Sequence, residues 1–276
     1  MPVELLPVVL LCAAIALACW LLSVLTREYS WVDRVWSLTP ILYVGYFAAA
    51  ASVLDPRLLL MTALVALWGG RLTFNFARKG GYRKGGEDYR WAVVRRRMPT
   101  RAFAVFNVLF IAGYQNLLLL LLSLPAWIVS TQAPSPLGVL DLVAATGMVV
   151  MLAGETLADE QQWVFQVRKH AALNSGAPIE QRFLTTGLFR FCRHPNFFCE
   201  QGIWWMFYGF GVAAGAPWLN AALVGPVLLS LLFLGSTALT EQITLSKYPE
   251  YAAYQRRVSR LLPWWPRRER PDQVGI

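Results

Sequence analysis

Residues 103–130 read FAVFNVLFIAGYQNLLLLLLSLPAWIVS, a run that contains no charged side chain. The hydrocarbon core of a bilayer is about 30 Å thick, and an α-helix of about 20 apolar residues crosses it because each residue rises about 1.5 Å. This run is long enough for such a crossing. It predicts that the chain is an integral membrane protein built from α-helices.

The rest of the chain repeats this pattern. Hydrophobic residues make up 57% of the 276 residues and charged residues only 15%, against about 25% charged in an ordinary soluble domain. We therefore predict an all-α, multi-pass membrane protein with a single membrane domain over 1–276 and a cytoplasmic tail at 241–276. The seven expected spans lie at about 4–25, 36–54, 57–77, 103–130, 137–158, 197–214 and 217–240.

The basic residues predict the orientation in the membrane. If the seven spans alternate in direction, all of the 25 lysines and arginines except Arg57 fall on one side. Cytoplasmic loops carry such an excess of basic residues, so we expect the N-terminus outside and the C-terminus in the cytoplasm. The net charge of +9 then reflects contact with anionic membrane lipids, and no nucleic-acid partner is expected. The sequence leaves the oligomeric state open.

The four cysteines are Cys12, Cys19, Cys192 and Cys199, and no two of them form a CxxC pair. Ligand spacings at zinc sites are usually tighter than the one between Cys192 and Cys199. We therefore expect no metal site and no disulfide framework.

A polar stripe is expected where the fifth span reaches the cytoplasm. In the run GETLADEQQWVF at 154–165, the side chains of Glu155, Asp159 and Gln162 share one helical face. Ionisable groups at membrane depth are costly and normally face a partner or a cavity. The stripe predicts a binding site, and the alternative is a helix end with solvated acids.

A basic segment precedes the sixth span. In GLFRFCRHPNFFCE at 187–200, Arg190, Arg193 and His194 come just before Pro195, which can open a helix. Free backbone N–H groups at a helix start, together with arginines, favour an anion. Glu200 lies about one turn inside that helix. The pattern predicts a site for a phosphate-bearing ligand, and the alternative is a basic loop with a buried Glu200 paired to an arginine.

The segment after the last span is a further candidate for function. There Glu241 is followed by Tyr248, Tyr251, Tyr254 and Arg256. Their aromatic rings could sandwich a flat ring, while the arginine could hold phosphate. The alternative is a belt of interfacial aromatic anchors.

Asp33 lies at the inner end of the second span, where it could pair with an arginine or orient a proton donor. The glycine-rich run at 79–91 is expected to form a mobile lid or clamp.

Four stretches resemble one family of membrane enzymes. The runs GLFRFCRHPNFFCEQ at 187–201 and KYPEYAAYQRRVSRLLPWWP at 247–266 resemble the C-terminal half of the steroid 5α-reductases. GETLADEQQWVFQ at 154–166 and GGEDYRW at 85–91 are typical of bacterial relatives grouped as the DUF1295 type. The resemblance covers most of residues 30–266.

The resemblance implies NADPH as cofactor, bound on the cytoplasmic side, and reduction of the 4,5 double bond of a 3-oxo-4-ene steroid or another lipid enone. It implies that Asn196, Glu200 and Asp159 contact the cofactor. Together with the patterns above, the expected cofactor-binding residues are Arg71, Glu155, Asp159, Gln162, Arg168, Arg190, Arg193, His194, Asn196, Glu200, Glu241, Tyr248, Tyr251 and Arg256.

The expected catalytic residues differ from the family's pattern. By resemblance, Asp33 falls near the acid that polarises the substrate ketone together with a tyrosine. The place of that tyrosine is taken by Trp68. We therefore expect Asp33 to act with Tyr43 or Tyr89, and Tyr46 is a further replacement to test.

Two other functions remain open. Membrane methyltransferases of the isoprenylcysteine carboxyl type share an Arg-His-Pro segment and bind S-adenosylmethionine, but they usually show two adjacent glutamates where this chain has Glu241 and Gln242. A transporter or scaffold without enzymatic activity is the third possibility. A transporter would favour an internal repeat and polar groups at the membrane midplane, which the sequence lacks.

Overall fold

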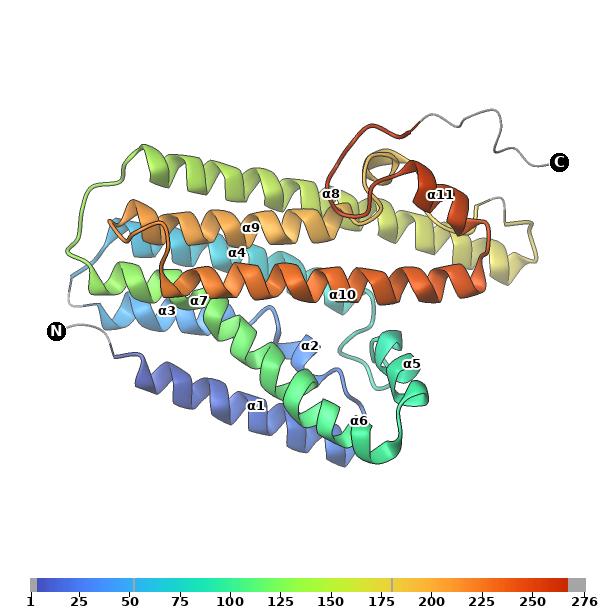
Figure 1. Cartoon of the computed structure of the whole chain (residues 1–276), viewed down its shortest axis with the longest axis horizontal. Helices are drawn as coiled ribbons and strands as arrows, with labels where there is room; N and C mark the ends of the chain where they lie inside the picture. Colours follow the sequence, from blue (N-terminus) through green and yellow to red (C-terminus); the bar gives the residue numbers. More distant parts are fainter. Residues whose placement is uncertain (1–3, 52, 180, 268–276) are drawn as a thin grey trace. The chain divides into compact units, whose positions relative to one another are not determined.

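The computed structural model describes residues 4–51, 53–179 and 181–267, and within these ranges every regular element is helical. Figure 1 shows their course. The elements are α1 (Leu6–Thr26), α2 (Trp31–Val35), α3 (Thr39–Ala50), α4 (Pro56–Arg78), α5 (Tyr89–Arg97), α6 (Thr100–Phe106), the π-helix η1 (Asn107–Tyr114), α7 (Gln115–Thr131), α8 (Val139–Ser175), the 3-10 helix η2 (Gly187–Arg190), α9 (Pro195–Ala213), the 3-10 helix η3 (Ala221–Leu223), α10 (Val224–Lys247) and α11 (Tyr251–Arg257).

Five helical segments are long and apolar enough to cross a membrane, which confirms the prediction of an all-α membrane protein. They are Leu6–Thr26, Pro56–Arg78, Thr100–Thr131, Val139–Ser175 and Ala221–Lys247.

The spans expected at 36–54 and 197–214 correspond to α3 and α9. Helix α3 has 12 residues, which is about 18 Å of helix and shorter than the bilayer core. Helix α9 has 19 residues and carries Glu200 and Gln201 near its start.

The chain divides into two compact units. Unit 1 comprises residues up to 149 together with 204–230, and unit 2 comprises 150–203 together with the chain from 231 onward.

Unit 1 is built around α3, which packs against both α4 and α7. Its buried side chains include Tyr43 and Phe47 from α3 and Trp68 from α4. The Trp68 ring meets the Trp204 ring edge-on, with centroids 4.9 Å apart.

Helix α1 runs beside η1 and α7 (Figure 1). The buried side chains of α1 form a narrow stripe, and its large apolar side chains such as Leu10 are exposed, as expected for a helix that faces lipid.

Unit 2 contains the close packing of α8 against α9. A Cβ atom on Gly154 would come within 2.9 Å of the Cys199 Sγ, and one on Gly202 within 2.7 Å of the Met151 Sδ. Only glycine fits this approach, because real Cβ atoms keep larger distances. The pairs 151 with 202 and 154 with 199 run in opposite directions along the chain. The two helices are therefore antiparallel in this region.

Candidate functional site

Unit 2 buries three carboxylates, two on α8 and one on α9. Glu155, Asp159 and Glu200 are only 4%, 5% and 6% exposed. The antiparallel pairing of residue 154 with residue 199 places Glu155 and Glu200 at about the same level along the two helices. Buried carboxylates are costly unless hydrogen-bond donors or cations surround them. The stripe expected from the sequence therefore lies inside the unit and is not a solvated helix end.

Asn196 belongs to the same end of α9. It is half-buried in the first turn of the helix, four residues before Glu200. Residues four apart lie on the same face of a helix, so its amide and the Glu200 carboxylate share one face. Gln162 is half-buried on α8, one turn beyond Asp159. These positions agree with the stripe that the sequence predicts.

Arg193 and Glu241 form a buried ion pair just before α9. Arg193 Nε lies 2.6 Å from Glu241 Oε1, and Arg193 Nη2 lies 3.1 Å from Glu241 Oε2. The His194 Nε2 is 3.0 Å from the same Oε1 atom, and Gln255 Nε2 donates to Oε2 at 2.9 Å. Arg193 and Glu241 are 9% and 2% exposed. Three expected cofactor-binding residues thus form one network with a residue of α11.

The same arginine anchors the C-terminal segment. Arg193 Nη1 donates to the backbone carbonyls of Gln255, at 2.9 Å, and Val258. The backbone N–H groups of Arg193 and His194 donate to the carbonyls of Ser259 and Arg260 at 2.9 and 3.1 Å. The sequence predicts an open anion site before α9. In the structure these two N–H groups and this guanidinium instead hold the tail in place.

The tyrosines of the tail surround one phenylalanine. Phe183 contacts the rings of Tyr248, Tyr251 and Tyr254, with centroids 6.4, 4.9 and 5.8 Å away. Tyr254 Oη donates to the Phe189 carbonyl at 2.5 Å. Burial raises the pKa of the Tyr251 and Tyr254 hydroxyls. Phe183 therefore occupies the space where the sequence suggests a flat ligand ring.

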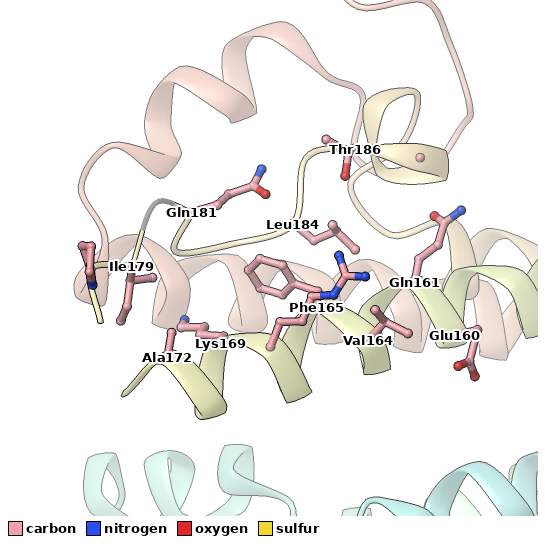
Figure 2. Close-up of a pocket in the computed structure, with 13 residues that line it drawn as sticks. Glu160, Gln161, Val164, Phe165, Lys169, Ala172, Ile179, Gln181, Leu184 and Thr186 are labelled. Atoms are coloured by element: carbon pink, nitrogen blue, oxygen red, sulfur yellow. The ribbon is translucent and has the colours of Figure 1, made fainter. Parts of the chain in front are cut away.

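A pocket of about 590 Å³ lies between the C-terminal half of α8 and the segment that follows it. In Figure 2 the side chains of Val164 and Phe165 project from α8 toward Leu184 of the following segment, and the three form an apolar part of the lining. Arg168 and Lys169 add positive charge. The lining consists of Glu160, Gln161, Val164, Phe165, Arg168, Lys169, Ala172, Pro178, Ile179, Gln181, Leu184, Thr186 and Gly187.

The pocket and the buried carboxylates occupy different faces of α8. Residues 161, 164, 165, 168 and 172 line the pocket. At about 100° per residue, residue 164 is rotated by about 140° from Asp159 and residue 168 by about 180°. Arg168 therefore belongs to the pocket and not to the carboxylate stripe. Lys169 donates to Tyr248 Oη at 3.1 Å, which connects the pocket wall to the tail.

Two expected cofactor-binding arginines are on the surface of unit 2. Arg190 closes η2, and Arg256 lies in the last turn of α11; both are exposed. The expected residue Arg71 lies on α4 in unit 1 and is half-buried.

The expected catalytic residues all lie in unit 1, in three different surroundings. Asp33 Oδ2 accepts a hydrogen bond from the indole Nε1 of Trp91 at 3.1 Å. Burial, followed by the nearby Asp88 carboxylate, raises the Asp33 pKa. Tyr43 is fully buried on α3, whereas Tyr89 is 51% exposed at the start of α5. Tyr43 is thus the tyrosine enclosed among the unit 1 helices.

Hydrogen bonds connect the glycine-rich loop to the segment that follows α1, and its action as a lid or clamp stays a prediction. Glu28 accepts from the Gly85 N–H at 2.7 Å and from Arg34 Nη2 at 2.6 Å. Arg34 Nε in turn donates to the Gly81 carbonyl at 3.2 Å. Gly85 needs its residue type because its φ is +78°, a conformation in which a side chain is strained. Gly85 therefore allows the turn that this loop makes.

Three residues of these networks lie in the stretches that carry the family resemblance, at 85–91 and 247–266, but no spacing pattern singles them out. Trp91 binds Asp33 across 58 positions, and Gln255 binds Glu241 across 14. Arg260 Nε also lies 3.6 Å from Glu241 Oε2. None of these residues belongs to a spacing pattern, because their partners are brought close only by the tertiary fold.

Comparison with known proteins defines the family. The sequence profile of DUF1295, described as a protein of unknown function, matches residues 19–258. The chain belongs to this family. It is 38% identical over 258 residues to an uncharacterized protein of the fission yeast Schizosaccharomyces pombe, an alignment that covers 88% of this chain and 75% of the yeast protein. No solved structure shows significant similarity.

Proposed function

We propose that the protein is a membrane-embedded, NADPH-dependent reductase that saturates the carbon–carbon double bond of a 3-oxo-4-ene steroid or another lipid enone. The observation that carries this proposal is the set of three buried carboxylates, Glu155 and Asp159 on α8 and Glu200 on α9. Buried ionisable groups in a membrane protein usually mark a functional site. Membership of the DUF1295 family and the likeness of four sequence stretches to steroid 5α-reductases support the same reading.

The residues present suit the groups of NADPH. Carboxylates and the Asn196 amide accept hydrogen bonds from ribose hydroxyls and from the nicotinamide carboxamide. The exposed arginines Arg190 and Arg256 suit its phosphates, because guanidinium binds phosphate in a bidentate manner. When bound, the nicotinamide would supply the hydride. The protein would position it and exclude water.

The proton would come from the substrate side. As hydride is added to the β-carbon of an enone, negative charge develops on the ketone oxygen. A hydroxyl group held in a buried environment can donate a proton there. Tyr43, which is fully buried, is the tyrosine that we assign to this step. Asp33, whose carboxylate accepts from Trp91, lies in other surroundings and is not assigned to this step.

We also propose that α3 and α9 complete a set of seven membrane crossings. The basic residues then gather on the cytoplasmic side, with the N-terminus outside. NADPH is polar and anionic, so it would approach from that side. The apolar substrate would enter from the lipid.

The test is a titration of the purified, detergent-solubilised protein with NADPH and, separately, with S-adenosylmethionine. We expect NADPH to bind with a Kd of about 1 μM or tighter and S-adenosylmethionine not to bind. Asp159→Asn and Glu200→Gln should each weaken NADPH binding by about tenfold, the effect of one lost charged hydrogen bond. Glu160→Gln is the matched control, since it changes the neighbouring acid on another face of α8.

A second measurement follows the loss of NADPH when testosterone, a 3-oxo-4-ene steroid, is added. We expect turnover in the wild type and its loss in Tyr43→Phe with NADPH binding retained. Binding of S-adenosylmethionine alone would replace the reductase with a methyltransferase. Binding of neither ligand would favour a transporter or scaffold. Glu241, the residue compared with the glutamate pair of the methyltransferases, is occupied by Arg193, His194 and Gln255, which supports the reductase.

A further inference from the structure

The segment that follows α11 leaves three large apolar side chains exposed. Leu262, Trp264 and Trp265 are 70%, 72% and 71% exposed, and they lie within four positions of one another in the sequence. We refer to these three side chains as the tail patch. The tail patch belongs entirely to unit 2. Neighbouring apolar side chains that a folded segment leaves exposed mark a surface that binds a membrane or another protein.

The backbone that carries the tail patch is ordered by hydrogen bonds. The Trp264 N–H donates to the Phe191 carbonyl at 2.9 Å, and the Trp265 ring meets the Phe191 ring edge-on with centroids 5.2 Å apart. A few residues earlier, the Ser259 carbonyl accepts from the Arg193 N–H at 2.9 Å. The exposure of the tail patch therefore belongs to the folded unit. A surface that is already ordered loses little conformational entropy when it binds.

The attachment of the tail to α9 places the tail patch close to the edge of the bilayer core. Residue 154 of α8 lies beside residue 199 of the antiparallel α9, so the start of α9 at Pro195 is level with about residue 158 of α8. About 20 residues lead to this level from the start of α8 at Val139, the length that crosses a hydrocarbon core of about 30 Å. In Figure 1 the segment after α11 turns back to the start of α9, while α8 continues beyond it.

Helix α10 gives the same depth independently. About 17 residues of this helix, which starts at Val224, precede Glu241, the partner of Arg193, so the chain is again close to the edge of the hydrocarbon core. Both α8 and α10 are long and apolar enough to span a membrane. The tail is bound to the two spans at this level. Its exposed tryptophans therefore lie at the depth of the lipid headgroups, where tryptophan is enriched in membrane proteins.

Exposed arginines accompany the tail patch. The stretch 251–267 contains four arginines and no aspartate or glutamate. Arg257, Arg260 and Arg267 are exposed, and the Arg267 N–H donates to the Arg257 carbonyl at 2.8 Å. A guanidinium group binds phosphate oxygens in a bidentate manner. Each arginine near an anionic membrane surface strengthens binding about fivefold. The charge of this segment is therefore complementary to anionic lipid headgroups.

We propose that the tail patch, together with Arg257, Arg260 and Arg267, binds anionic phospholipids at the surface of the membrane that the protein spans. The two indole rings and the leucine enter the boundary between headgroups and acyl chains, and the guanidinium groups bind the lipid phosphates. The depth set by α8 and α10 favours lipid over a soluble partner. None of these residues is an expected cofactor-binding residue, so the inference does not rest on the reductase proposal.

The experiment measures which lipids lie beside position 262. In the full-length protein, Leu262→Cys is labelled with the fluorophore NBD and reconstituted into phosphatidylcholine nanodiscs. The four native cysteines are buried, and the unsubstituted protein treated in the same way gives the background. The nanodiscs contain a minor share of a lipid with a nitroxide on its acyl chain, which is either phosphatidylglycerol or phosphatidylcholine. We expect both to quench the fluorophore, with a preference for phosphatidylglycerol of about fivefold or more, the effect of at least one arginine.

A triple variant and a second labelling position provide the controls. Arg257→Gln, Arg260→Gln and Arg267→Gln together should reduce the preference to about one and leave quenching by phosphatidylcholine in place. Because these arginines are exposed, the triple variant should melt like the wild type. Leu219→Cys is the matched position, since Leu219 and its neighbour Trp218 are 80% and 69% exposed in a loop, 214–223, that has no basic residue. Both lipids should quench a fluorophore there equally.

The absence of quenching at position 262 would overturn the proposal and leave water or a protein partner beside the tail patch. Equal quenching by the two lipids would also overturn it, because only an apolar anchor without headgroup binding would remain. A preference that survives in the triple variant would refute the role of the arginines. If that variant fails to fold, added salt replaces it: screening should abolish the preference, and a preference that salt leaves unchanged would overturn the proposal. Titration of the same samples with NADPH separates this result from the fate of the reductase proposal.

Discussion

Arg57 and Asp141 form a two-pronged ion pair in unit 1, with Nε 2.6 Å from Oδ1 and Nη2 2.9 Å from Oδ2. Both side chains are 2% exposed. Asp55 caps the same helix by accepting from the Arg57 N–H at 2.7 Å. The arginine also reaches Ser135 at 3.1 Å. The one basic residue that the orientation rule expects on the outer side is thus neutralised by a buried partner.

We expect removal of one partner of this pair to destabilise the protein strongly. Arg57→Met leaves the Asp141 carboxylate buried without its cation, which should lower the free energy of unfolding by about 3–5 kcal/mol. Thermal melting in detergent measures the effect. The double variant Arg57→Met with Asp141→Leu removes both charges and should recover most of the loss. A double variant as unstable as the single one would show that the pair itself, and not the uncompensated charge, determines the effect.

The sequence predicts most of the membrane-spanning helices, but not how long each of them is. Long apolar runs with few charges predict α1, α4, α8 and the continuous helical segment from α6 through η1 to α7, because a helix needs about 20 residues to cross a bilayer. The shortness of α3 was not visible in this way. The expected segment 36–54 carries no charged residue, but α3 begins only at Thr39, with Pro40 in its first turn.

The candidate site shows the same division. Helical spacing correctly predicts that Glu155 and Asp159 share a face, because i and i+4 positions are fixed by the helix itself. The role of Arg193 was less visible. The basic segment around Arg193 suggests an anion site. In the structure Arg193 instead binds Glu241 and Gln255, which lie 48 and 62 positions further along the chain. The π-helix η1 likewise has no signature in the residue types from Asn107 to Tyr114.

The Arg193–Glu241 pair should control whether the C-terminal segment stays docked. Arg193→Ala removes the ion pair and the bonds to the Gln255 and Val258 carbonyls, so residues 249–267 should become sensitive to protease. Limited digestion with proteinase K, followed by mass spectrometry, measures the cleavage rate in this segment. We expect an increase of about tenfold or more, which corresponds to about 1.4 kcal/mol of lost docking free energy.

Arg256→Gln is the control for that experiment, because this exposed arginine lies on the same short helix. It should digest like the wild type. Equal protection of the tail in Arg193→Ala and in the wild type would contradict an anchoring role for Arg193.

The Asp33 carboxyl should make stability depend on pH. Burial raises its pKa, so the folded protein holds this proton more readily than the unfolded chain does. The stability that this group contributes is then complete below its ordinary pKa of about 4 and declines as the pH rises through the raised value. Asp33→Asn keeps an oxygen for the Trp91 N–H and cannot ionise. We expect the variant to gain stability relative to the wild type as the pH is raised from about 4 to about 7.

Glu28→Gln gives the opposite dependence and serves as the comparison. The backbone N–H of Gly85 and then the Arg34 guanidinium lower the Glu28 pKa, so its contribution is present above the ordinary pKa and is lost as the pH falls. Melting temperatures of the three proteins between about pH 3 and pH 7 test both signs. Parallel curves for Asp33→Asn and the wild type would refute the assignment of a raised pKa to Asp33.

Cys192 should resist thiol reagents while the tail is docked. Its side chain is fully buried, and its thiol lies 3.3 and 3.0 Å from the carbonyl oxygens of Arg260 and Leu261. Burial raises its pKa to about 11, so at pH 8 the reactive thiolate is about two orders of magnitude rarer than for an ordinary cysteine. Maleimide labelling resolved by mass spectrometry should therefore be at least about 100-fold slower in the folded protein than in the denatured one. Because the covering segment is held by Arg193, the Arg193→Ala variant should label Cys192 much faster. Rapid labelling of Cys192 in the folded wild type would mean that the tail does not cover it.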